Sequence, residues 1–221
     1  MGRLAEGSRG NLPPKNIKRG GIHYTGKGAV IDSVARTYSG YWAQIHECLD
    51  KTESSNPGLG RKVPTAKALE EISATFREAH EEGSRVFFVG NGGSAAIASH
   101  MAVDYTKNGR IRSLALNDAA TLTCFGNDYG YDRVFAKQLE FQGAKDDVLV
   151  VISSSGRSLN IIGAADQAMS MGFRMVLTLT GMNPNNVLRQ KGTWNLYVPC
   201  SDYGLVECSH LILLHSMIGR A

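Results

Sequence analysis

The sequence predicts an α/β protein in which helices cover both faces of a central parallel sheet. Short apolar runs rich in β-branched and aromatic residues alternate with longer segments of helical periodicity. Turns rich in glycine or serine directly follow two of these runs. The chain of 221 residues is long enough for one sizeable core, and its hydrophobic fraction of 43% is ordinary for a globular protein. We therefore expect one three-layer αβα domain with two leading helices.

The first 28 residues differ in composition from the rest of the chain. They contain six basic residues and one acidic residue, a net charge of +5, and they are rich in Gly and Pro without apolar periodicity. We expect residues 1–28 to be a disordered basic tail and residues 29–221 to form the domain. Because the whole chain carries +4, the domain is left with −1, which argues against a nucleic-acid-binding surface.

Two amphipathic helices are expected before the first apolar strand. The first covers residues 29–50 and is followed by a loop at Asn56-Pro57-Gly58. The second runs from Pro64, a favourable first-turn residue, to Gly83, a favourable C-terminal stop. Their apolar stripes consist of Ile31, Val34, Tyr38, Tyr41, Ile45 and Cys48, and of Leu69, Ile72, Phe76 and Ala79. These faces could close the domain or bind partner subunits, and we favour oligomerisation.

The remaining chain alternates between strands and helices. Strands are expected at residues 86–89, 113–116, 147–152, 173–180 and 196–199. Helices are expected after Ser94 and at residues 119–125, 132–141, 158–171 and 206–218, with a polar loop at 126–130. Ligands of such parallel sheets bind beyond the carboxyl ends of the strands, so the turns at those ends are the first candidates for a site.

The turn Gly90-Asn91-Gly92-Gly93-Ser94 follows the first apolar strand. Glycines let a ligand approach the backbone closely. Ser94 is placed to cap the next helix, whose first turn offers unpaired N–H groups and a partial positive charge. This combination suits an anion such as phosphate, although similar turns also occur without a ligand. The turn matches neither the dinucleotide-binding fingerprint nor a P-loop.

A second turn of the same kind, Ser153-Ser154-Ser155-Gly156-Arg157-Ser158, follows the strand expected at 147–152. Its hydroxyls and backbone N–H groups again converge at the start of a helix, where Ser158 is the expected cap. A serine-rich turn alone could be purely structural. Two such turns at one edge of one sheet are more specific, and together they favour a phosphorylated ligand.

The spacing of the cysteines bears on the cellular compartment of the protein. Cys48, Cys124, Cys200 and Cys208 form no C-x-x-C pair, which suggests reduced thiols in a cytoplasmic protein. The sequence contains neither an apolar span of membrane-crossing length nor the core of a signal peptide.

The motifs together resemble a known family. GNGGS followed by H-x-x-x-D, then ISSSGRS and a C-terminal E-x-x-H-x-x-x-x-H, is similar to the sugar-isomerase (SIS) fold from residue 29 onward. Within that fold the chain looks like the phosphoheptose isomerases. The resemblance implies a homotetrameric aldose–ketose isomerase that binds neither nucleic acid nor membrane. Its reaction would convert sedoheptulose 7-phosphate to D-glycero-D-manno-heptose 7-phosphate through an enediol(ate), the first step of nucleotide-activated heptose biosynthesis.

The resemblance also implies roles for individual residues. The substrate phosphate would be held by Ser94, Ser153, Ser154, Ser155 and Ser158, and Gly92 and Gly93 would also bind the substrate. Asn91 and Asp118 would contact sugar hydroxyls, and Asp104 and His215 would be the catalytic base and its acid/base partner. Gly126-Asn127-Asp128 also matches the family's pattern, without an assigned role.

The family's zinc ligands fall on His100, Asp104, Glu207 and His215, with Glu207 also placed at the substrate. Asp104 stands where Glu is usual, and Glu207 where Gln is usual. Two facing carboxylates repel unless a proton or a cation lies between them. We therefore expect one zinc ion per site on these four residues. Helical spacing would also accept His210 in place of His215.

Three other functions stay open. A non-catalytic SIS adaptor is expected to lack the His and carboxylate residues, which this chain has. A sugar-phosphate-sensing regulator usually carries a DNA-binding domain, and no helix-turn-helix pattern fits in residues 1–28. An isomerase of a different ketose phosphate is compatible with the two departures at Asp104 and Glu207.

Overall fold

The computed structural model describes residues 37–218. The tail expected at 1–28, and Ile31 and Val34 of the first apolar stripe, lie outside the described residues. The helices are α1 (Tyr38–Asp50), α2 (Thr65–Glu81), α3 (Gly93–Lys107), α4 (Ala119–Tyr129), α5 (Val134–Gln142), α6 (Leu159–Ser170) and α7 (Tyr203–Ile218), with short 3-10 turns η2 (Pro57–Leu59), η3 (Tyr131–Arg133) and η4 (Val187–Gln190). The strands are β1 (Glu53–Asn56), β2 (Arg61–Val63), β3 (Val86–Gly90), β4 (Ser113–Ala115), β5 (Val148–Ser153), β6 (Met175–Gly181) and β7 (Trp194–Val198).

The strands form one seven-stranded mixed sheet in the order β2-β1-β7-β6-β5-β3-β4. The five strands from β7 to β4 are parallel, as predicted, and β1 and β2 add an antiparallel hairpin at the β7 edge. The chain passes from β3 outward to β4 and then returns to β5 on the other side of β3. The carboxyl ends of β3 and β5 therefore form a topological switch point, where ligands of such sheets bind.

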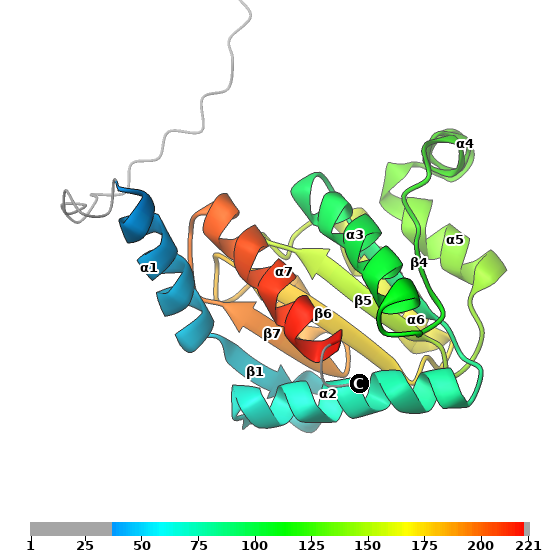
Figure 1. Cartoon of the computed structure of the whole chain (residues 1–221). Helices are drawn as coiled ribbons and strands as arrows, with labels where there is room; N and C mark the ends of the chain where they lie inside the picture. The colour runs from blue at the N-terminus through cyan, green and yellow to red at the C-terminus, as the bar shows by residue number, and fades with distance from the viewer. Residues whose placement is uncertain (1–36, 219–221) are drawn as a thin grey trace, which may run out of the picture.

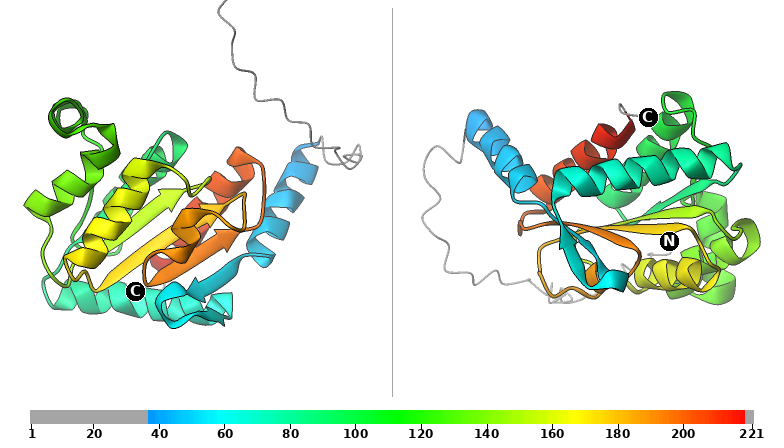
Figure 2. Two further views of the ribbon diagram at one scale, coloured as in Figure 1. Left: turned by 180° about the vertical axis from the view of Figure 1, so that it is seen from behind. Right: turned by 90° about the horizontal axis from the view of Figure 1, so that it is seen from below.

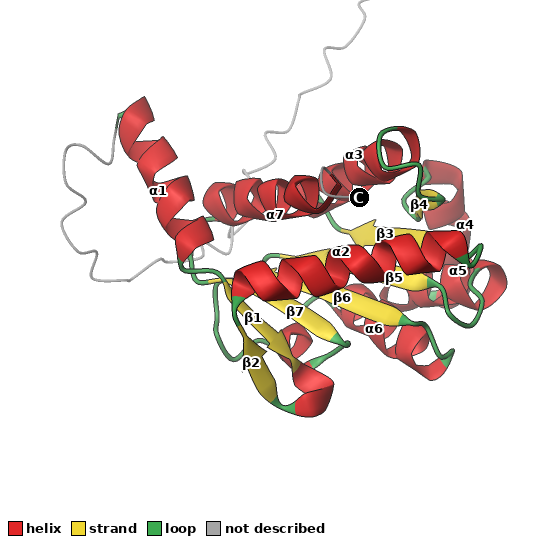
Figure 3. Ribbon diagram, turned by 60° about the horizontal axis from the view of Figure 1, so that its bottom comes forward, coloured by secondary structure: helices red, strands yellow, loops and turns green. Residues whose placement is uncertain are grey.

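Helices cover both faces of the sheet. In Figure 1, α3 and α7 lie side by side over one face, with α1 beside α7 and α2 crossing below them. The view from behind places α5 and α6 over the opposite face (Figure 2). Figure 3 shows the sheet between these two helical layers. The predicted three-layer αβα arrangement with two leading helices is therefore confirmed.

The strand side chains divide between two cores. Val86 and Phe88 of β3 face the core under α2, α3 and α7, whereas Phe87 and Val89 face the core under α5 and α6. The same alternation continues through β5 and β6. Burial on both faces explains why these strands appear in the sequence as continuous apolar runs without an alternating polar side.

One local expectation was incomplete and one was wrong. The segment around Asn56-Pro57-Gly58 is the turn of the β1–β2 hairpin, whose strand β1 pairs with β7 through Ser54 and Leu196. The expected polar loop at 126–130 is helical up to Tyr129, because α4 continues through Gly126 and ends at Gly130 with φ of 84°. Gly126 and Asn127 resemble a turn in sequence, but i→i−4 hydrogen bonds persist through them, for example from Gly130 to Gly126.

The apolar stripes of the two leading helices differ in how far they are buried. In α2, Ile72, Phe76 and Ala79 are buried in the core, and Leu69 packs against it. In α1, Ile45 and Cys48 pack on the core, whereas Tyr38 and its neighbour Trp42 are exposed, at 87% and 67%.

Candidate active site

The two predicted anion-binding turns lie side by side. Gly90, the last residue of β3, pairs with Ile152, the residue before the serine-rich turn. A cavity of about 270 Å³ lies between the two turns and the start of α7. Its lining residues are Asn91, Gly92, Gly93, Ser94, Ile152, Ser153, Ser154, Ser155, Ser158, Tyr203 and Glu207. We call this cavity the serine pocket.

Two glycines allow the turns to fold this tightly. A Cβ atom on Gly90 would lie 2.5 Å from the backbone carbonyl of Ser94, so β3 and α3 approach too closely for any other residue. Gly156 has φ of 61°, and a Cβ atom there would overlap the side chain of Asn186. Both positions therefore require glycine.

Of the three helices that begin at the serine pocket, α3 and α6 have no side-chain cap, whereas Asp202 caps α7 through the N–H of Leu205. The N-cap of α3 is Gly92 and not Ser94, which is buried inside the first turn. Ser158 is the N-cap of α6 as expected, but its hydroxyl accepts no capping hydrogen bond. The N–H groups of Ala95 and Ile161 already donate to Gly92 and Ser158, so the N–H groups of the first two residues of α3 and α6 are the ones available to an anion.

The serines themselves have different partners. The Oγ of Ser153 accepts a hydrogen bond from the backbone N–H of Gly156 at 3.2 Å and so stabilises the turn. The Oγ of Ser154 is buried at the pocket and has no hydrogen-bond partner. An unpaired buried hydroxyl is costly, and a ligand in the pocket would satisfy it.

Asn91 is tied into a hydrogen-bond network that sequence analysis missed. Its Nδ2 donates to Oδ1 of Asn160 at 2.9 Å, and Nδ2 of Asn160 donates back to Oδ1 of Asn91 at 3.0 Å. The hydroxyl of Tyr131 also donates to Oδ1 of Asn91, at 3.1 Å. The Asn91 amide therefore ties the first turn to the start of α6, directly after the serine-rich turn, and its contact with sugar hydroxyls stays a prediction.

Asp118 lies outside the lining of the serine pocket. It is the N-cap of α4, and its Oδ1 accepts hydrogen bonds from the backbone N–H and the hydroxyl of Thr121 at 3.0 and 3.1 Å. The backbone hydrogen bond from Thr121, followed by the side-chain one, lowers the pKa of Asp118. The structure thus gives this residue a capping role, and its contact with the sugar stays a prediction.

His100, Asp104 and His215 form a second group, farther along α3 and α7. Nε2 of His100 lies 3.4 Å and Nδ1 of His215 lies 3.6 Å from the same oxygen, Oδ2 of Asp104. The two imidazole rings meet edge to face, with centroids 5.3 Å apart. Both histidines are partly exposed, so the carboxylate is accessible from the surface together with two groups that accept and donate protons.

This group fits a metal ion. One ligand atom from each of the three residues lies within 4.8 Å of the others. Ligand atoms around a tetrahedral zinc at about 2.0–2.2 Å are separated by about 3.4 Å, which is close to the two distances measured here. Glu207, the fourth expected ligand, lies outside the group and lines the serine pocket. Three protein ligands with one open position are typical of catalytic zinc.

His210 is excluded as the functional histidine. It is fully buried, and its Nε2 lies 3.1 Å from the carbonyl oxygen of Thr180, to which it donates. Burial lowers the pKa of His210 to about 4, so the ring is neutral near pH 7. Of the two alternatives left open by helical spacing, the structure therefore places His215, and not His210, beside Asp104.

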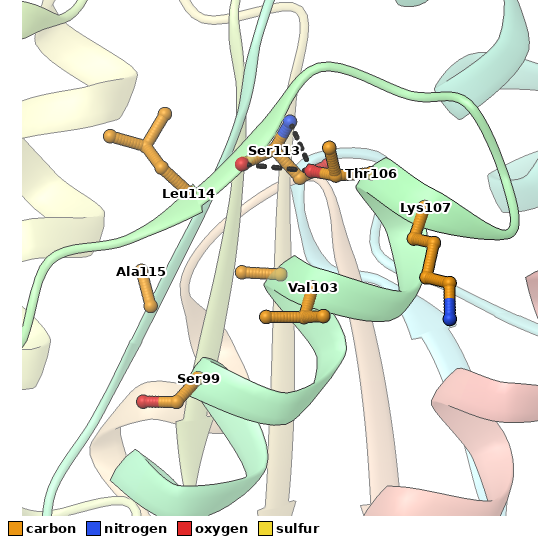
Figure 4. Close-up of a pocket in the computed structure, with 8 residues that line it drawn as sticks. Ser99, Val103, Thr106, Lys107, Ser113, Leu114 and Ala115 are labelled. Atoms are coloured by element: carbon orange, nitrogen blue, oxygen red, sulfur yellow. Dashed lines mark hydrogen bonds between the residues drawn. The ribbon is translucent and has the colours of Figure 1, made fainter.

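An apolar groove of about 400 Å³ lies elsewhere, between α3 and the edge strand β4 (Figure 4). It is lined by Ser99, Ala102, Val103, Thr106, Lys107, Ser113, Leu114 and Ala115. None of the predicted site residues lines this groove. The chemistry indicated by the motifs is instead divided between the serine pocket and the His–Asp group.

A mainly parallel sheet with a serine-lined pocket at its switch point and a His–Asp group beyond it is the arrangement expected of a protein that binds phosphorylated metabolites and transfers protons. Comparisons with known proteins narrow this class. The model of the SIS domain matches residues 61–181. The phosphoheptose isomerase of Campylobacter concisus is 39% identical over 176 residues, covering 76% of this chain and 91% of that protein. The phosphoheptose isomerase of Aliarcobacter butzleri is 37% identical, and the match covers 67% of this chain and 81% of that protein.

Solved structures with the same fold also include phosphoheptose isomerases. A phosphoheptose isomerase from Neisseria gonorrhoeae has a TM-score of 0.68 and 28% identity, and the match covers 82% of this chain and 96% of that one. A phosphoheptose isomerase from Francisella tularensis has a TM-score of 0.68 and 25% identity, and the match covers 87% of this chain and 97% of that one. The chain belongs to the SIS-domain family and, within it, to the phosphoheptose isomerases. Within residues 37–218, no helix has the length and apolarity needed to cross a membrane.

Proposed function

We propose that the protein converts sedoheptulose 7-phosphate to D-glycero-D-manno-heptose 7-phosphate, with Asp104 as the base. The observation that carries this proposal is the position of one carboxylate between two imidazoles, on the same helix that begins at the serine pocket. His100 lies seven positions after Gly93 along α3, a rise of about 10 Å. This span is comparable to the length of an extended seven-carbon sugar phosphate.

The serine pocket would bind the phosphate through helix ends and hydroxyls. Fixing the phosphate there directs the other end of the sugar, C1 and C2, toward His100 and Asp104. Isomerisation needs a base that removes a proton from one carbon and an acid that returns a proton to its neighbour. Asp104 would take the proton, and His215, 3.6 Å from it, would transfer protons to and from the oxygens of the enediol.

The site would hold a divalent metal ion, with zinc as the expected metal, on His100, Asp104 and His215. When bound, the metal would polarise the sugar oxygens and stabilise the negative charge that develops on them. The two histidines are neutral as ligands, so acid should weaken metal binding.

The metal assignment predicts that zinc binding depends on His215. We expect about one zinc ion per chain in equilibrium dialysis, and loss of that binding in His215→Ala, because only two ligands remain. His46 on α1 provides a matched control, since Nδ1 of His46 pairs with Asp50 at 3.1 Å in the same i, i+4 spacing but without a third ligand. Zinc binding that persists in His215→Ala, or is lost equally in His46→Ala, would contradict the assignment.

The serine pocket predicts opposite effects on stability and binding for Ser154→Ala. Removing an unpaired buried hydroxyl should leave the free energy of unfolding unchanged or higher. Loss of a hydrogen bond to a charged phosphate should weaken substrate binding by about tenfold. Denaturant unfolding and the KM of the isomerase reaction measure the two effects. A variant that is less stable but binds the sugar phosphate normally would show that the hydroxyl has a structural role.

We further propose a homotetramer and a cytoplasmic location. Exposed Tyr38 and Trp42 on α1 support contacts with another copy, and the four cysteines are free thiols. The mass in solution tests the tetramer.

The function itself is tested by incubating the protein with sedoheptulose 7-phosphate and following the aldoheptose product by NMR. Binding without turnover would favour the adaptor or regulator. If another ketose phosphate is converted with a higher kcat/KM, that sugar, and not sedoheptulose 7-phosphate, is the preferred substrate.

A further inference from the structure

The carboxylate of Glu207 lies directly on the first turn of α3. A Cβ atom on Gly93 would overlap it, with Oε1 and Cδ of Glu207 only 2.6 Å away. Because α3 has no side-chain cap, the Glu207 carboxylate occupies the position where a capping group, or a bound anion, would interact with the helix end.

The rest of the pocket has no positive side chain to balance this carboxylate. Its lining residues include neither Lys, Arg nor His, and Arg157 of the serine-rich turn is exposed and is not one of them. The remaining polar groups are neutral, among them the buried Ser154 hydroxyl that has no partner. The pocket therefore contains two groups with opposite effects on an anion. The Ser154 hydroxyl could donate a hydrogen bond to it, whereas the Glu207 carboxylate beside the uncapped end of α3 would repel it.

We propose that Glu207 must move aside when a phosphate binds, and that it thereby lowers the affinity of the serine pocket for phosphate. This proposal rests on the proposed function, because it assigns the phosphate to the serine pocket. Glu207 is half-buried and lines the pocket, so its side chain is not enclosed on every side. Moving the carboxylate, and holding a phosphate close to it, weakens the binding of every phosphate ligand to a similar extent.

The consequence is that the phosphate group alone does not bind tightly, so occupancy of the pocket depends on contacts with the rest of the ligand. Inorganic phosphate contacts the serine pocket alone and stays weakly bound. A heptose phosphate also reaches the His–Asp group, and those contacts offset the displacement of Glu207. A neutral amide at position 207 would not impose this cost.

Binding of inorganic phosphate to Glu207→Gln tests the proposal. We expect about tenfold tighter binding by calorimetry, the scale for removing one like charge a few ångströms away in surroundings close to water. Glu70→Gln is the matched control, because it removes the same charge from an exposed position on α2 and should leave phosphate affinity unchanged. Glu207→Ala gives a second measurement that does not depend on how the Gln side chain is accommodated, and it should also bind phosphate more tightly.

Unchanged or weaker phosphate binding in both Glu207 variants would overturn the proposal, as would equal tightening in Glu70→Gln. Turnover of sedoheptulose 7-phosphate by the unaltered protein is measured in parallel. Turnover without any gain in phosphate affinity rejects the role of Glu207 and leaves the proposed function standing. A gain in affinity without turnover supports the role of Glu207 and rejects the isomerase.

Discussion

Replacing Asp104 with Asn should lower kcat/KM for the isomerase reaction by about a thousandfold, within the range found for removing a general acid or base. Asn has nearly the same shape as Asp but cannot accept the proton from the sugar carbon. Both imidazoles that face Oδ2 would also lose their charged partner. Steady-state kinetics measures the loss, and exchange of the sugar C1 or C2 hydrogen with deuterated water shows whether proton removal itself is affected.

The chain supplies a matched control for this variant. Asp50 pairs with His46 at the same i, i+4 spacing on α1, so Asp50→Asn removes an equivalent pair away from the site. It should leave turnover unchanged. Asp104→Glu keeps a carboxylate on a side chain one methylene longer and should retain activity. If Asp104→Asn keeps most of the wild-type rate of hydrogen exchange, another group is the base.

The site could be predicted from sequence to the extent that it depends on local pattern and strand order. The Gly90–Ser94 and Ser153–Ser158 turns each follow an apolar strand, and parallel strands place such turns at one edge of the sheet. Asp104 and His100 share a helix face by their spacing alone. These features need no knowledge of contacts between distant side chains.

What the sequence could not show depends on such contacts. Asn91 and Asn160 are 69 positions apart, and nothing in either local pattern indicates that their amides pair. The direction of Glu207 toward Gly93, away from His100 and His215, is set by the packing of α7 against α3. Strand β1 was missed because its sequence, Glu-Ser-Ser-Asn, has no apolar alternation and is extended only through pairing with β2 and the edge of β7.

His210 should make the protein sensitive to acid. Burial lowers the pKa of His210 in the folded protein to about 4, whereas the unfolded chain has the ordinary value near 6.5. Between these two values the unfolded state binds more protons, so the free energy of unfolding rises with pH across this window and falls as the solution is acidified. A difference of this size corresponds to a loss of up to about 3 kcal/mol between pH 6.5 and pH 4.

The residue is placed so that protonation cannot easily be accommodated. A protonated ring would carry donors on both nitrogens, but Nδ1 has no hydrogen-bond partner and only Nε2 faces an acceptor, the carbonyl of Thr180. His210→Gln keeps a donor for that carbonyl and does not titrate. We therefore expect urea unfolding at several pH values to show a shallower pH dependence in His210→Gln, whatever its stability at pH 7. His46→Gln removes an exposed histidine and should keep the wild-type slope. If the His210→Gln variant loses as much stability in acid as the wild type, other groups cause the acid sensitivity and His210 is not buried in its neutral form.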